Sequence, residues 1–223
     1  MNLLAIDTAL EDCSVAIMTG SAERAPVTIS ETVGRGHAER LFGMVEAAMR
    51  EAGLAFANLD RIAVTTGPGS FTGLRVGIAA ARGLALVIGC PVVGIGTLEA
   101  IAAAARESVG PVPVLAVLDA KRDEVYAEAF DAGGLSLSEP VARPAAGIAS
   151  LLRDGMVLAG PGAGLVAACL PSPPRVVAVP PTPDIAAVLR LGAAAPPGAE
   201  PPRPLYLRAP DARPQAAAAI ARR

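Results

Sequence analysis

A glycine-rich stretch at residues 65–75, TTGPGSFTGLR, is the first place in the sequence where phosphate chemistry could occur. A nucleotide-binding P-loop needs the pattern G-x-x-x-x-G-K-[ST], in which the lysine reaches the outer phosphates. Here Gly73 is followed by Leu74 and Arg75, so the lysine and the spacing are both missing. The dinucleotide pattern G-x-G-x-x-G also fails, because Gly73 comes one residue late. The stretch therefore predicts a tight strand-to-helix junction, and only the general attraction of an anion to a helix start stays open.

Two carboxylates occupy matching places in the two halves of the chain. Asp7 ends the first expected strand, and Asp119 ends the strand that opens the second half. A two-lobed nucleotide-binding fold would hold metal and phosphate at these places. The turns that follow them lack glycine, so the backbone there is less free to wrap a phosphate. We interpret Asp7 as a strand-end turn carboxylate, with cofactor binding by Asp7 as the alternative.

Other groups that could carry catalysis are scarce. His37 has Leu41 four residues later, so no histidine pair for a metal exists. No nucleophile motif of the form G-x-S-x-G occurs. Cys13, Cys90 and Cys169 lack zinc-binding spacing and are expected to be buried free thiols. The sequence thus predicts no catalytic residue and no metal site.

Composition limits the class of protein. The chain has 223 residues, 52% of them hydrophobic, and a formal net charge of -2. It therefore lacks a broad positive field for gripping nucleic acid. No uncharged apolar run reaches the roughly 18 residues of a membrane span, and the amino terminus has no basic region before its apolar stretch. We expect a globular cytoplasmic protein that does not enter a membrane.

The elements that must position these residues follow from hydrophobic periodicity. Three consecutive strands suggest an antiparallel meander, and a helix-strand-helix-strand-helix order follows. The second half starts again with two strands, as a looser copy of the opening, and then becomes rich in proline. The expected strands are 3–7, 13–18, 28–33, 61–66, 91–96, 112–118, 125–129 and 176–179, and the expected helices are 37–52, 72–88, 97–106 and 184–194. We divide the chain into an N-terminal lobe, 1–108, and a smaller C-terminal lobe, 109–223.

The expected helix 72–88 is apolar on almost every side. Gly73, Gly77 and Ala81 recur every four residues, and each interior glycine costs about 1 kcal/mol relative to alanine. Something must therefore approach that face closely. The helix has Arg75 and Arg82 as its only charges. Because a sheet covers only one side of a helix, we expect a second protein on the other side, pressed against the glycine and alanine surface.

Five segments in order resemble the TsaB (YeaZ) family: LLAIDTALEDCSVAI, HAERLFGMVEAAM, TTGPGSFTGLRVGIAAARGLA, VLDAKRDEVYAEAF and PLYLRAP. The resemblance spans nearly the whole chain, and GPGSFTGLRVG is its most specific part. It implies an α/β, two-lobed fold of the actin, Hsp70 and sugar-kinase type (ribonuclease H-like), with a mixed sheet flanked by helices in each lobe. The end of the chain, DARPQAAAAIARR, departs from the typical family pattern.

The resemblance also implies partners. They are a TsaD-like catalytic subunit and a TsaE-like ATPase, with a homodimer when the chain is alone and tRNA reached only through the complex. It implies no cofactor of the chain's own, with ATP or ADP allowed at the interface with the catalytic partner. Relative to the histidine pair of TsaD, Leu41 stands where the second histidine would be. The implied contact residues, on helices 37–52 and 72–88, are His37, Arg40, Leu41, Met44, Ala48, Arg75, Val76, Ala79 and Arg82.

Three hypotheses about function remain. The first is a non-catalytic scaffold that binds and activates a TsaD-like threonylcarbamoyl transferase in modification of adenosine 37 of tRNA. The second is an ATP-binding or ATP-hydrolysing enzyme of the sugar-kinase-like superfamily. The third is a protease-like hydrolase, for which the residues give little support. We adopt the first as our prediction.

Overall fold

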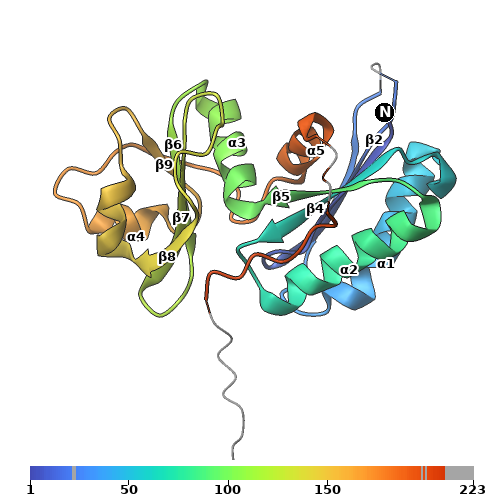
Figure 1. The fold of residues 1–223 in the computed structure, drawn as a ribbon, viewed down its shortest axis with the longest axis horizontal. Coiled ribbons are helices and arrows are strands. Elements are labelled where there is room, and N and C mark those ends of the chain that lie inside the picture. The colour runs from blue at the N-terminus through green and yellow to red at the C-terminus, as the bar shows by residue number, and fades with distance from the viewer. Residues whose placement is uncertain (22–23, 197, 199, 209–223) are drawn as a thin grey trace, which may run out of the picture.

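Two five-stranded mixed sheets form the framework of the computed structural model, which describes residues 1–21, 24–196, 198 and 200–208. The first sheet has the order β3-β2-β1-β4-β5 and lies at the right of Figure 1. Its strands are β1 (Leu3–Asp7), β2 (Asp12–Met18), β3 (Val27–Thr32), β4 (Arg61–Gly67) and β5 (Val92–Gly96). All five residues of β1 are buried, as expected for a central strand covered on both faces.

The second sheet repeats the topology of the first. In the first, β1 pairs antiparallel with β2 and parallel with β4, and in the second, β6 pairs antiparallel with β7 and parallel with β9. The order is β10-β9-β6-β7-β8. This confirms the predicted looser copy at the level of strand order. The strands are β6 (Val114–Asp119), β7 (Glu124–Phe130), β8 (Val141–Pro144), β9 (Val157–Ala159) and β10 (Val176–Val177), so the strand expected at 176–179 is shorter than predicted.

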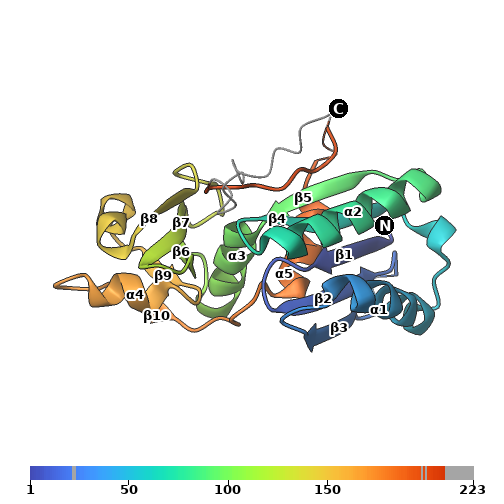
Figure 2. The same cartoon turned by 90° about the horizontal axis from the view of Figure 1, so that it is seen from below.

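Helices α1 (His37–Ala52) and α2 (Phe71–Ile88) cover one face of the first sheet. Figure 2, seen from below, shows both helices on the viewer's side of this sheet. The inward side chains of α1 include Leu41 and Val45, which join those of β2 in one apolar core. The Ser70 hydroxyl accepts a hydrogen bond from the Gly73 amide at 3.2 Å, so this serine caps the N-terminal end of α2.

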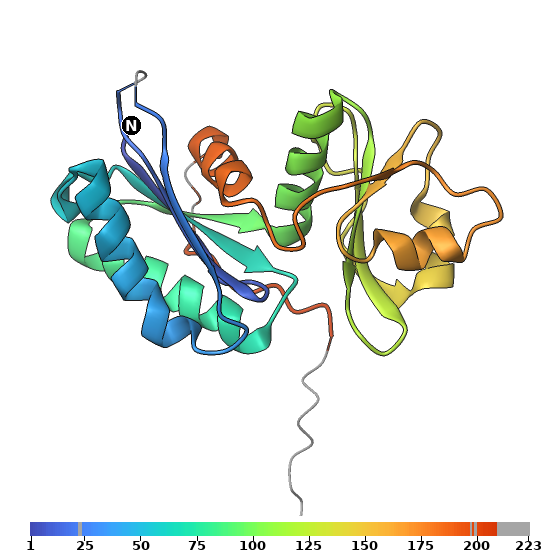
Figure 3. The same ribbon diagram turned by 180° about the vertical axis from the view of Figure 1, so that it is seen from behind.

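Two further helices lie between the sheets, as Figure 3 shows. Helix α3 (Thr97–Val109) packs on β6 and β7, and α5 (Ile185–Ala194) packs on β1, β4 and β2. The shorter elements are η1 (Phe56–Asn58), η2 (Ala145–Leu151) and α4 (Ala163–Ala168).

The position of α5 bears on the division into lobes. Arg61, at the start of β4, donates to the carbonyl oxygens of Gly192 at 2.9 Å and Ala195 at 2.6 Å, and so caps the C-terminal end of α5. Gly192 also lies directly on β4, where an added Cβ would come within 2.4 Å of the Ala63 Cβ. Packing therefore places α5 with the first lobe, whereas the sequence division at 108/109 placed it with the second.

Residues 209–223 lie outside the described residues. They include the last two residues of the family segment PLYLRAP and the segment DARPQAAAAIARR.

Residues 200–208, which we call the C-terminal strap, return along the first lobe and reach the second (Figure 1). The Leu205 amide donates to the Thr66 carbonyl at 2.8 Å in the first lobe. Arg208 donates to the Ala120 carbonyl at 2.8 Å in the second and forms an ion pair with Glu124. The strap thus bridges the two lobes.

Within the described residues, α2 is also the one helix whose length and hydropathy would suffice to cross a membrane. Its Gly73, Gly77 and Ala81 face is buried on the first sheet. In this fold α2 is a helix that contributes to the core of its lobe.

Candidate interface on helices α1 and α2

The glycine-rich stretch is packed against the chain's own backbone. An added Cβ on Gly69 would come within 2.3 Å of the Ala9 carbonyl oxygen, and one on Gly73 within 2.1 Å of the Thr8 carbonyl oxygen. The Ser70 amide donates to the Ala9 carbonyl at 2.7 Å, and the Thr8 hydroxyl donates to the Gly73 carbonyl at 2.7 Å. The turn after β1 fills the space that a phosphate would need, so these residues do not fit a phosphate cradle in the single chain.

The same contacts correct the prediction for the glycine face of α2. An added Cβ on Gly77 would lie 2.3 Å from the Thr8 hydroxyl oxygen. Gly73, Gly77 and Ala81 are all buried. The close neighbour that the glycines require is the end of β1, not a second protein, because α2 crosses the sheet at that point.

Asp7 is fully buried at the end of β1. Its Oδ1 accepts from the Thr65 hydroxyl at 2.6 Å and from the Ala9 amide at 3.0 Å. Its Oδ2 is sealed and has no partner among the described residues. Burial raises the pKa of the carboxyl from 3.8 to about 6, and the bond from Thr65 opposes this rise. Because neither oxygen is accessible, Asp7 does not fit a metal-nucleotide complex in this conformation.

Asp119 has a different environment, although it ends the topologically equivalent strand β6. Its Oδ2 lies 3.0 Å from the Lys121 Nζ, and its Oδ1 accepts from the Lys121 amide at 2.7 Å. These bonds hold the pKa of Asp119 below its usual value. Asp119 and Lys121 are thus both part of a turn.

The α1 residues predicted for the partner interface lie mostly in the core. His37, Leu41, Met44 and Ala48 are buried, and the His37 Nε2 lies 3.0 Å from the Leu10 carbonyl oxygen. The structure corrects the choice of these four as surface contacts, because the inward stripe of α1 covers β2. Arg40 is exposed and forms an ion pair with Glu31 at 2.6 Å.

The cysteines differ from one another. Cys13 is buried and burial raises the pKa of its thiol to about 11. Cys90 is partly buried and Cys169 is exposed, so the prediction of burial is wrong for Cys169, which ends the short surface helix α4. No group of three or more histidine, cysteine or acidic side chains suited to a metal is found in the described part of the chain.

One side of α2 faces solvent. Leu86 and Val87 are 85% and 87% exposed, and Phe42 of the adjacent α1 is 53% exposed. Residues three, four or eight apart share a side of a helix, so the exposed side chains form one stripe. Of the predicted contacts, Arg75, Ala79 and Arg82 are on it and Val76 is half-buried at its edge. We define the α2 outer face as Phe71, Arg75, Ala79, Arg82, Gly83, Leu86 and Val87.

Sequence reasoning did not single out Leu86 and Val87 as exposed residues of this helix. The signal was present, since a helix that is apolar all round must expose some of its apolar side chains when a sheet covers one side.

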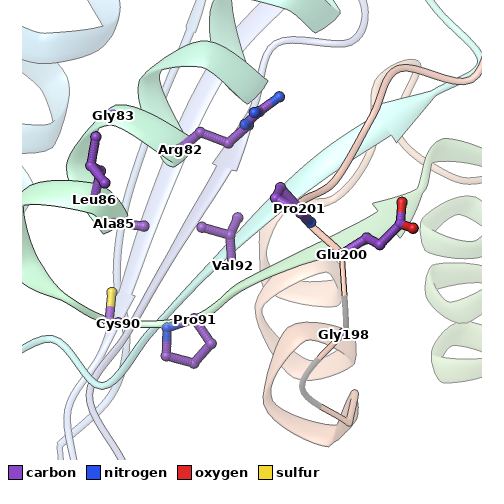
Figure 4. Close-up of a pocket in the computed structure, with 10 residues that line it drawn as sticks. All are labelled: Arg82, Gly83, Ala85, Leu86, Cys90, Pro91, Val92, Gly198, Glu200 and Pro201. Atoms are coloured by element: carbon purple, nitrogen blue, oxygen red, sulfur yellow. The ribbon is translucent and has the colours of Figure 1, made fainter.

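A groove of about 510 Å³ continues the α2 outer face at the C-terminal end of the helix (Figure 4). Arg82, Gly83 and Leu86 form one wall, and Glu200 and Pro201 lie opposite. The start of β5, with Pro91 and Val92, completes the lining. The exposed surface is therefore shared between α2 and the start of the C-terminal strap.

Comparison with known proteins shows the family to which the chain belongs. A family profile described as TsaD, tRNA N6-adenosine threonylcarbamoyltransferase, matches residues 28–164. The tRNA threonylcarbamoyladenosine biosynthesis protein TsaB of Escherichia coli is 40% identical over 126 residues, which cover 56% of this chain and 53% of that protein. The solved structure of YeaZ from Pseudomonas aeruginosa has a TM-score of 0.81 and 32% identity, over 92% of this chain and 99% of that one.

The chain belongs to the TsaB (YeaZ) family. The likeness to YeaZ extends over both lobes, so the predicted two-lobed actin, Hsp70 and sugar-kinase-like fold is confirmed. An uncharacterized protein of Mycobacterium tuberculosis is 38% identical over 227 residues, covering 96% of this chain and 95% of its own length. By contrast, the match spans about half the length of the E. coli TsaB protein.

Proposed function

We propose that this TsaB-family chain is a non-catalytic subunit that binds and activates a TsaD-like transferase, which attaches the threonylcarbamoyl group to adenosine 37 of tRNA. The role of the E. coli relative in tRNA threonylcarbamoyladenosine biosynthesis supports the pathway. The match to a transferase family profile supports a shared fold with the catalytic partner.

The observation that carries the proposal is the exposed α2 outer face. Leu86 and Val87, adjacent in sequence, are both more than four-fifths exposed. Complete burial of an aliphatic side chain of this size contributes about 1.5 to 3 kcal/mol, and contiguous exposed apolar surface marks an interaction site. A partner of the same fold would present its own helix pair, and two such pairs can pack as a helical bundle. The same face would serve a homodimer when the catalytic subunit is absent.

The absence of catalysis is part of the proposal. The sealed position of Asp7 and the filled glycine loop support it. We further propose that a TsaE-like ATPase joins the assembly, that tRNA is reached through the complex, and that ATP or ADP, if bound, lies at the interface with the catalytic subunit.

A pair of leucine-to-glutamate variants tests the interface. Leu86→Glu places a charge in the proposed contact and is expected to weaken binding to the purified transferase subunit by at least about 30-fold, measured by titration calorimetry. Leu137→Glu, at an exposed leucine of the second lobe, is the matched control and should bind within about twofold of the wild type. Circular dichroism establishes that both variants are folded.

Two results would contradict the proposed function. One is wild-type binding by Leu86→Glu. The other is magnesium-dependent ATP hydrolysis by the isolated chain that disappears in Asp7→Asn, which would favour the sugar-kinase-like enzyme.

A further inference from the structure

Arg75 is held in one orientation at the N-terminal end of the α2 outer face. Its guanidinium carbon lies 3.6 Å from the centroid of the Phe71 ring and 5.8 Å from that of the Tyr206 ring. The two rings are 5.2 Å apart, centroid to centroid. The Arg75 Nε donates to the Tyr206 hydroxyl at 2.9 Å. Phe71 is the first residue of α2 and Tyr206 comes from the C-terminal strap, so two distant segments build this cluster.

The orientation leaves the terminal amino groups of Arg75 available. The ring of Phe71 occupies one face of the guanidinium and Tyr206 takes the Nε donor. Some other arginines on the described surface have carboxylate partners: Arg40 pairs with Glu31, Arg190 with Glu107 and Arg208 with Glu124. Among the described residues, no carboxylate forms an ion pair with Arg75, although it is exposed. An oriented cation without a counter-charge is thus presented on the apolar outer face.

We infer that Arg75 is a preformed receptor for a carboxylate of the docking partner, an aspartate or glutamate side chain of the TsaD-like subunit. The inference rests on the proposed function and deepens it. The two terminal amino groups of a guanidinium match the two oxygens of a carboxylate, and such paired bonds are short and directional. Much of the side-chain entropy that binding normally removes is already removed by Phe71 and Tyr206.

The surroundings favour a protein carboxylate over an RNA phosphate. On the same outer face Ala79 lies one turn from Arg75, and Leu86 and Val87 lie beyond, so that Arg82 is the other charge on a mainly apolar surface. The cations on the nearby β6–β7 turn and strap are neutralised, since Lys121 pairs with Asp119 and Arg208 with Glu124. RNA binding draws its affinity from several phosphate contacts together, and the two arginines of the α2 outer face, Arg75 and Arg82, do not supply them.

Binding of full-length variants to the purified transferase subunit tests the inference. Arg75→Ala should weaken binding by roughly 10- to 100-fold, the range for a charge-assisted bond at an interface. Arg75→Lys keeps the charge but not the paired geometry, and should lie within about threefold of Arg75→Ala. Tyr206→Phe keeps the ring but removes the acceptor for the Arg75 Nε, and should weaken binding by about 3- to 10-fold. Arg203→Ala, on the same strap at an exposed arginine that pairs with Glu200, is the control and should change binding less than twofold.

A charge exchange identifies the partner group. Arg75→Glu should abolish binding, and replacing the matching acid of the transferase subunit by arginine should restore it. Wild-type binding by Arg75→Lys would overturn the inference, and so would wild-type binding by Arg75→Ala. If Leu86→Glu abolishes binding in that second case, the proposed function stands and only the role of Arg75 falls. Binding of tRNA by the isolated chain that is lost in Arg75→Ala would also overturn it, in favour of a phosphate.

Discussion

The carboxyl group of Asp7 lies among β1, the Thr65 hydroxyl of β4 and the turn that follows β1. One oxygen accepts two hydrogen bonds, and the other has no partner among the described residues. Burial penalises the charged form, which is why the pKa of Asp7 is raised to about 6. A buried carboxylate of this kind lowers the stability of the fold at neutral pH.

The sign of the effect follows from the direction of the shift. The folded state binds the proton of Asp7 more tightly than the unfolded state, so the stabilisation from this group is complete below about pH 4 and is lost as the pH rises through about 6. Asp7→Asn keeps the shape without the charge. We expect it to raise the free energy of unfolding at pH 7.5 by about 1 to 2 kcal/mol, and the melting temperature by about 3 to 6 °C.

Thermal denaturation of the wild type and Asp7→Asn at several pH values measures this difference in stability. The advantage of Asp7→Asn should shrink as the pH falls toward 4, while Glu46→Gln on the exposed side of α1 should show no such trend. If Asp7→Asn is less stable than the wild type at pH 7.5, the prediction is wrong. The charged form of Asp7 would then be stabilised by interactions other than its bonds from Thr65 and Ala9.

At the scale of elements, α2 has two faces with different tasks. The inner face, with Gly73, Gly77 and Ala81, allows the helix to lie directly on the end of β1. The outer face carries aliphatic side chains and arginines that the lobe does not cover. Because the inner face is fixed by backbone contact, the outer face is presented at a defined distance from the sheet.

Two glycines of α2 give opposite predictions for the same substitution. Gly73→Ala drives a Cβ to 2.1 Å from the Thr8 carbonyl oxygen, so we expect a loss of about 2 to 4 kcal/mol in the free energy of unfolding. Gly83→Ala meets no atom within 4 Å on the exposed side, and should gain about 0.5 to 1 kcal/mol from helix propensity. Urea denaturation of both variants measures the difference. Equal effects would mean that the inner face is not sealed against β1.

At the scale of the whole molecule, two sheets of the same topology are connected by α3 and by the C-terminal strap, which are about 100 residues apart in the sequence. Helix α3 lies between the sheets, and the strap contacts both lobes. Arg208 reaches the β6–β7 turn, in which Lys121, Arg122 and Asp123 all have positive φ angles near 60°. Such angles are unfavourable for residues other than glycine, so the bonds from Arg208 support this turn.

Removing that support should loosen the turn. We expect Arg208→Ala to increase hydrogen exchange at residues 120–124 by about tenfold and to lower the free energy of unfolding by about 1 to 3 kcal/mol. Arg203→Ala, five residues earlier on the strap, serves as the comparison. Unchanged exchange at the turn in Arg208→Ala would mean that the turn is held by its own bonds alone.

The sequence by itself determined much of the secondary structure and the fold class. The helix at 37–52 and the strand at 3–7 have the predicted bounds, because amphipathic periodicity and glycine caps are local properties of the chain. The order of the five sequence segments indicated the TsaB (YeaZ) family, and the comparisons confirm this prediction. The apolar character of α2 correctly indicated that one of its sides would lack cover within the chain.

Only the tertiary structure decided which residues are on that side. Local spacing shows that Gly73 and Gly77 need a close neighbour, but not that Thr8, 65 and 69 residues away, supplies it. It likewise cannot show that Leu41, Met44 and Ala48 turn inward, that α5 packs on the first sheet, or that Tyr206 orients Arg75. Each of these is a contact between distant segments, and such contacts depend on strand order and helix orientation rather than on the residues near them in the chain.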